Sequence, residues 1–169
     1  VGLGARFALV SRESTLLGNN VMLVVAAAAV LLGTLYPLLL DALGMGKISV
    51  GPPYFDSVFL PLMAPTLFLM GVGPIMRWKE SEVPDVARRL RWAVVVALLA
   101  SLVTGWIAGG ISLVATLGFV MAFWVLAAVI TQWWETVYQR GQGLGGVIRR
   151  SRQLPRAMVG MMVAHLGVA

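Results

Sequence analysis

The chain has 169 residues, of which 59% are hydrophobic and 12% are charged, and its formal net charge is +6. Soluble domains are about a quarter charged, so this chain has too few charges to cover a soluble globule and is predicted to be a membrane protein. The sequence contains no cysteine, which excludes a disulfide framework and a thiolate metal site.

Four segments are apolar over the roughly 20 residues that a membrane-spanning helix needs. They occupy residues 21–40, 59–76, 92–108 and 111–133. A fifth apolar run, 157–169, would cover about 20 Å of the roughly 30 Å hydrocarbon core. These runs are too long for strands and lack a polar face. The sequence therefore predicts an all-α, polytopic transmembrane bundle with four full spans and the start of a fifth.

The basic residues gather in alternate segments between these spans. Segments 1–20, 77–91 and 134–156 hold twelve of the thirteen, namely Arg6, Arg12, Arg77, Lys79, Arg88, Arg89, Arg91, Arg140, Arg149, Arg150, Arg152 and Arg156. Because cytoplasmic loops are enriched in Lys and Arg, we place these three segments in the cytoplasm, and 41–58 and 109–110 outside it. The positive charge thus sets orientation in a lipid bilayer, and no nucleic-acid partner is expected.

The sequence also contains three shorter motifs. Residues 141–146 (GQGLGG) have the letters of a dinucleotide-binding loop, but no strand precedes them, so we interpret them as a linker. The G-x-x-x-G motif at 105–109 is predicted to serve helix packing within the chain. Residues 46–58 carry Tyr54 and Phe55, which could anchor the loop at the membrane interface or line an extracytoplasmic site or partner surface.

The single histidine of the sequence, His165, lies in the fifth apolar run. It follows Arg156 by nine residues, which is about 13 Å of helix and reaches close to the middle of the bilayer. Three methionines share or adjoin its helix face and are predicted to pack: Met158, Met161 and Met162. Ionisable residues in lipid usually face a functional cavity. His165 could therefore be a cofactor ligand, a proton or ion relay, or one half of an interhelical hydrogen bond.

Five stretches in order resemble the middle-to-C-terminal part of the CcmF family, the haem lyases of the cytochrome c maturation system. They are SRESTLLGNN (11–20), LLGTLYPLL (31–39), GKISVGPPYFD (46–56), GVGPIMRW (71–78) and MVAHLGVA (162–169). The resemblance implies a protein of the bacterial inner membrane with 41–58 in the periplasm. It also implies that haem is received from a haem chaperone and attached to the two thiols of a C-x-x-C-H motif in apocytochrome c.

The same resemblance implies a separate haem b held in the membrane by two histidines on different helices, one of them His165. That haem is implied to pass electrons that keep the incoming haem iron reduced. The tryptophan-rich segment and the other histidines of the family are missing from this sequence, and Trp133–Glu135 does not replace them.

We therefore expect no catalytic residue here. The second ligand would come from the remainder of the same protein or from a split partner chain, and the chain, which starts at Val1, is interpreted as a piece of something longer. The competing expectation is a transporter or proton-relay segment with His165 as the relay.

Overall fold

The computed structural model describes residues 8–139 and 143–169, and every regular element in this part is helical. The elements are α1 (Arg12–Ala42), α2 (Pro52–Val72), the 3-10 helix η1 (Gly73–Ile75), α3 (Val83–Ile107), α4 (Leu113–Val137), α5 (Leu144–Arg152) and α6 (Arg156–Val168). By length and composition, four of the described helices can cross a membrane, and α6 is apolar but shorter. The predicted all-α membrane fold with four full spans is confirmed, and α6 occupies the position of the fifth apolar run.

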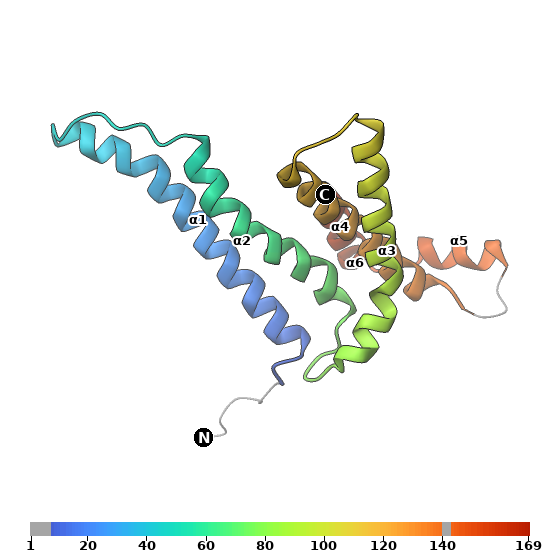
Figure 1. Cartoon of the computed structure of the whole chain (residues 1–169). Coiled ribbons are helices and arrows are strands. Elements are labelled where there is room, and N and C mark those ends of the chain that lie inside the picture. The colour runs from blue at the N-terminus through green and yellow to red at the C-terminus, as the bar shows by residue number, and fades with distance from the viewer. Residues whose placement is uncertain (1–7, 140–142) are drawn as a thin grey trace, which may run out of the picture.

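Helices α1, α2 and α3 begin well before the spans expected from hydropathy, and α4 ends after its expected span (Figure 1). Helix α1 begins at Arg12 because the hydroxyl of Ser11 accepts a hydrogen bond from the Ser14 amide at 3.2 Å. Helix α2 begins inside the expected loop 41–58, with Pro52 and Pro53 in its first turn, where the missing proline amides cost nothing. Hydropathy marks the part of a helix that suits lipid, whereas these capping features decide where the helix starts.

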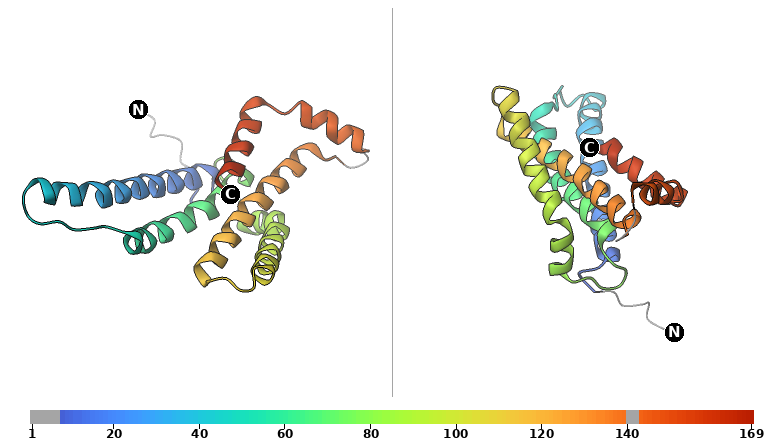
Figure 2. Two further views of the ribbon diagram at one scale, coloured as in Figure 1. Left: turned by 90° about the horizontal axis from the view of Figure 1, so that it is seen from above. Right: turned by 90° about the vertical axis from the view of Figure 1, so that its right-hand side faces the viewer.

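Two antiparallel hairpins form the body of the molecule, α1 with α2 and α3 with α4 (Figures 1 and 2). The hairpins meet where α2 packs on α4, and α6 packs on another part of α4, while α5 projects from the bundle. The turn from α3 to α4 uses Gly109 and Gly110 at φ values of 73° and 105°, which residues with a Cβ rarely adopt. Gly105 packs against Ile111 across this turn, as predicted for the motif at 105–109.

Small residues bring α3 and α4 together. The facing surfaces carry Ala93 and Ala97 on α3 and Ala127 and Ala128 on α4, all buried, and small side chains allow close approach of membrane helices. The three methionines of α6 pack against the same core, with Met162 7% exposed. Their predicted packing role is confirmed.

Hydrogen bonds join the loop after η1 to the start of α1. The Ala8 amide donates to the Lys79 carbonyl at 2.8 Å, and the Ser81 amide donates to the Val10 carbonyl at 2.7 Å. Lys79 has a φ of 68°, and its amide donates to the Glu13 carboxylate at 2.8 Å. These bonds fix the first turn of α1 relative to the end of α2.

An ion pair ties the second hairpin together at the same end of the molecule. Arg89 of α3 pairs with Glu135 of α4, and its Nη1 donates to the Ile75 carbonyl at 2.9 Å. Both charged side chains are about two-thirds buried. The pair therefore links η1, α3 and α4, and it gives Glu135 a structural contact.

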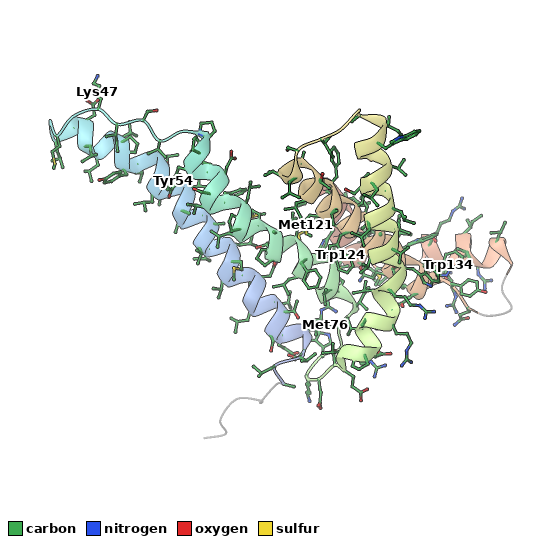
Figure 3. The ribbon with its side chains drawn as sticks, in the orientation of Figure 1. Lys47, Tyr54, Met76, Met121, Trp124 and Trp134 are labelled. Atoms are coloured by element: carbon green, nitrogen blue, oxygen red, sulfur yellow. The ribbon has the colours of Figure 1, made fainter. Side chains whose placement is uncertain are left out.

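Tyr54 and Phe55 join the two helices of the first hairpin. The Tyr54 hydroxyl donates to the Ala29 carbonyl at 2.9 Å, and both rings lie against Gly33 of α1. Figure 3 shows Tyr54 near the far end of this hairpin. Because both aromatic side chains are half-buried between helices, they have a packing role that neither interpretation of residues 46–58 included.

Candidate functional site

A groove of about 400 Å³ lies between α1, the end of α2 with η1, and α6. Most of its lining is apolar, from Leu16, Leu23, Met63, Leu69, Met70, Gly73, Pro74, Met161, Ala164 and Val168. Five polar side chains also line it, namely Arg12, Thr15, Asn19, Thr66 and His165. The groove has the volume and character typical of small-ligand sites, which are mostly apolar with a few polar groups.

His165 is presented to the groove by α6 in a defined state. Its Nδ1 lies 2.8 Å from the Met161 carbonyl oxygen, one turn earlier in the same helix. A carbonyl can only accept, so in the neutral ring Nδ1 carries the proton and Nε2 keeps the lone pair. Nε2 has no hydrogen-bond partner among the described residues. The interhelical hydrogen bond left open by the sequence is thus not among the contacts of His165 in this part of the chain.

Some of the other polar groups of the groove have hydrogen-bond partners, and others have none. The Thr15 hydroxyl donates to the Ser11 carbonyl at 3.0 Å and lies 2.8 Å from the Met76 sulfur, and the Thr66 hydroxyl donates to the Leu62 carbonyl at 2.7 Å. In contrast, Nε of Arg12 and Oδ1 of Asn19 are buried without a partner. The groove therefore offers three unused polar groups, those of Arg12, Asn19 and His165.

Sequence reasoning identified His165 but missed Arg12 and Asn19. Both lie more than 140 positions away on α1, and no local pattern links them to α6. The one available signal was the polarity of Asn19 at the edge of the apolar run 21–40. Of the expected linker 141–146, residues 144–146 instead form the first turn of α5. Residues 141 and 142, like Arg6 and Arg140, lie outside the described residues.

The groove meets the requirements for one face of a haem site. A planar apolar macrocycle needs an apolar wall, and its iron needs a neutral imidazole with a free nitrogen lone pair. The lining and the state of His165 supply both. Among residues 8–139 and 143–169, no cluster of three or more His, Cys, Asp or Glu side chains could bind a metal ion alone. The chemistry of the site thus suits a prosthetic group better than a bare cation.

Comparisons with known proteins relate the chain to one group of proteins. No family model matches the sequence. The cytochrome c-type biogenesis protein CcmF of Pseudomonas fluorescens is 40% identical over 163 residues, which is 96% of this chain and 24% of that protein. CcmF of Escherichia coli is 39% identical over the same shares of the two chains. CycK of Rhizobium meliloti is 38% identical over 98% of this chain and 24% of that protein.

A solved structure shows the same fold. The cytochrome c haem lyase CcmF matches 95% of this chain and 24% of its own chain, with a TM-score of 0.64 and 29% sequence identity. The chain thus spans about a quarter of the length of its curated relatives. Over the region that it spans, the chain belongs to the CcmF family of cytochrome c-type biogenesis proteins.

Proposed function

We propose that the chain is a membrane part of a cytochrome c haem lyase, in which His165 is one of two axial ligands of a buried b-type haem. The observation that carries the proposal is the state of His165. Its Nδ1 is engaged by the Met161 carbonyl, and Nε2 is left for a ligand in an apolar groove. The names of the relatives support the haem-lyase role.

The rest of the activity belongs to the same proposal. A second axial histidine would come from another part of the same protein or from a split partner chain, because this sequence contains one histidine. Receipt of haem from a haem chaperone and its attachment to apocytochrome c would involve residues outside this chain. The proposed contribution of this chain is the membrane-embedded haem site.

Each part of the groove has a task in this proposal. The Met161 carbonyl fixes the tautomer and orientation of the imidazole, as a partner on the other ring nitrogen does for metal-bound histidines. The leucine and methionine side chains of the lining exclude water. When bound, the haem would supply a one-electron iron couple, and the burial of its site would tune the potential of that couple.

The relay alternative has less support from the lining. A proton relay needs a second titratable group within reach of the histidine. None of the described residues that line the groove is Asp, Glu or Lys, and its other charged side chain is Arg12, whose guanidinium does not release its proton in proteins. The composition of the lining therefore favours a ligand site over a proton relay.

The test is the absorbance spectrum of the complex purified from its native membrane through a tag on this chain. We expect a Soret band and sharp α and β bands after reduction, because two imidazole ligands give low-spin iron. The pyridine haemochrome assay should identify haem b. A folded complex with no haem would refute the proposal and leave the relay or a structural scaffold. Proton flux into liposomes would then separate those two.

We also propose the orientation that the arginines indicate, with the α1–α2 and α3–α4 turns in the periplasm. Because the chain contains no cysteine, a single substitution introduces a unique thiol into it. Ser49 and Gln153 are both exposed, and in the proposed orientation they lie on opposite sides of the membrane. The two test variants are therefore Ser49→Cys and Gln153→Cys. In intact spheroplasts, a membrane-impermeant maleimide should label the first variant, and should label the second only after permeabilisation. The unsubstituted chain is the control, and the reverse pattern would invert the proposed topology.

A further inference from the structure

The groove has a cationic end that the haem-iron proposal does not use. Arg12 is the first residue of α1, and His165 lies about 13 Å along α6 from its first residue, Arg156. Both helices are proposed to start at the same side of the membrane. Arg12 therefore lies at the membrane boundary, and His165 lies deeper in the apolar region of the same groove.

The position of Arg12 is fixed by its surroundings. Its amide donates to the Arg77 carbonyl at 3.0 Å, within the loop that is fastened to the start of α1. Its guanidinium carbon lies 4.8 Å from the centre of the Trp78 ring, which is a cation–π contact. A cation held in this way is already ordered before any ligand binds, so binding costs little additional side-chain entropy.

The same guanidinium lacks an anionic partner in the described part of the chain. Residues 8–139 and 143–169 contain three ion pairs, and none of them includes Arg12. The neighbouring carboxylate of Glu13 accepts from the Lys79 amide instead. Nε of Arg12 is buried and unpaired, and a buried donor left without an acceptor is costly. Such a group calls for an acceptor brought by a ligand, and a guanidinium matches the geometry of a carboxylate or a phosphate.

We infer that Arg12 binds a carboxylate of the haem whose iron is bound by His165. This inference rests on the proposed function. Haem b is an apolar disc with its iron at the centre and two carboxylates on one edge, so it needs an apolar wall, an imidazole and a cation near water. The lining of the groove contains all three, namely apolar side chains, His165 and Arg12. Asn19, seven residues after Arg12 and so about 10 Å along α1, adds an amide to the same wall.

The role given to Arg12 is positional and electrostatic. Binding of the carboxylate would fix the rotation of the haem about its iron axis. The positive charge would also favour the reduced iron, which has one positive charge less than the oxidised iron. Removing the charge should therefore lower the midpoint potential without changing the axial ligands, a readout that does not depend on lyase activity.

The test compares haem with its dimethyl ester, which has no ionisable carboxylate. Both are added to the detergent-solubilised complex purified from haem-deficient cells. The unsubstituted complex should bind haem about tenfold more tightly than the ester, the factor expected from one hydrogen bond to a charged group. Arg12→Met should bind the two equally and show a lower midpoint potential with unchanged band positions. Arg12→Lys should retain part of the discrimination.

Arg91→Met is the matched control. Arg91 also lies over a tryptophan, 5.5 Å from the centre of the Trp92 ring, but it is exposed and does not line the groove. This variant should behave like the unsubstituted complex. The comparison of haem with its dimethyl ester in the unsubstituted complex tests the inference even if Arg12→Met fails to fold.

Four outcomes would overturn the inference. If the complex binds haem and its ester equally, no cation recognises the carboxylates, although the iron-ligand proposal stands. If Arg12→Met discriminates as the unsubstituted complex does, another residue binds them. If Arg12→Met instead loses only co-purified phosphatidylglycerol, Arg12 binds lipid phosphate. A complex that binds neither compound would refute the proposed function together with this inference.

Discussion

Replacing His165 with alanine is expected to abolish the b-type absorbance bands of the complex. The substitution removes the one imidazole of this chain from the groove, and no other described side chain of the lining presents a free ring nitrogen. Low-spin spectra require two strong-field axial ligands, so loss of one should leave high-spin haem or none. Cytochrome c assembly should fall with the spectrum. The measurement is the reduced-minus-oxidised spectrum per mole of purified complex.

A rescue experiment separates loss of the ligand from loss of the fold. In His165→Gly the groove gains room for a free imidazole, at a cost in helix stability of about 1 kcal/mol. Addition of imidazole to this variant should restore the low-spin bands. Leu166→Ala is the control, because Leu166 is the next residue in α6 and does not line the groove. An unaltered spectrum in His165→Ala would refute the ligand assignment.

Gly71→Leu is expected to be the most damaging substitution outside the groove. A Cβ atom at Gly71 would lie 2.5 Å from Nε1 and 2.7 Å from Cε2 of Trp124. The Trp124 indole cannot easily move, since it is 4% exposed and donates to the Phe68 carbonyl at 3.2 Å. Figure 3 shows Trp124 where the two hairpins meet. Overpacking at such a site costs about 1–3 kcal/mol, and leucine should reach or exceed the upper end.

Gly71→Leu should lower the haem content of the complex as well as its stability. Gly71 lies between Met70 and Gly73, which both line the groove, so separating α2 from α4 displaces the groove wall. We expect a lower thermal midpoint in detergent and reduced haem content. Gly118→Ala on α4 is the control, because no atom lies within 4 Å of its Cβ position.

A double substitution makes this test specific for the predicted clash. Trp124→Phe should partly rescue Gly71→Ala, because the smaller ring frees the space that the new methyl group needs. Additive effects of the two substitutions would contradict the clash, as would equal stability of Gly71→Leu and Gly118→Ala.

Hydropathy predicted the four spanning helices and the position of α6, but it predicted neither the helix ends nor α5, which lies in a basic segment expected to be a loop. Apolar runs report the preference of side chains for lipid, and the four spans were found on that basis. The polar first turns of α1 depend on the cap at Ser11 and on bonds to the loop at Lys79, which hydropathy does not register. The start of α2 depends in part on Tyr54 packing against α1.

Of the three residues with unused polar groups in the groove, one could be predicted from the sequence. His165 was conspicuous because a polar side chain in an apolar run is costly. Arg12 seemed to be one more arginine at a membrane boundary, where arginines are common. Its place in the groove follows from the fold, which brings α1 and α6 to line the same groove. Such a tertiary arrangement of distant segments leaves no periodic signal in a single sequence.

The turns within the two hairpins affect how the chain enters the membrane. On the proposed orientation, the α3–α4 turn exposes little more than Gly109 and Gly110 on the far side, and the α1–α2 turn carries one cation, Lys47. That cation lies 3.9 Å from Asp41, so its charge is partly neutralised locally. Little polar material must then cross the bilayer during biosynthesis, and each hairpin can insert as a pair of helices with a low barrier to translocation.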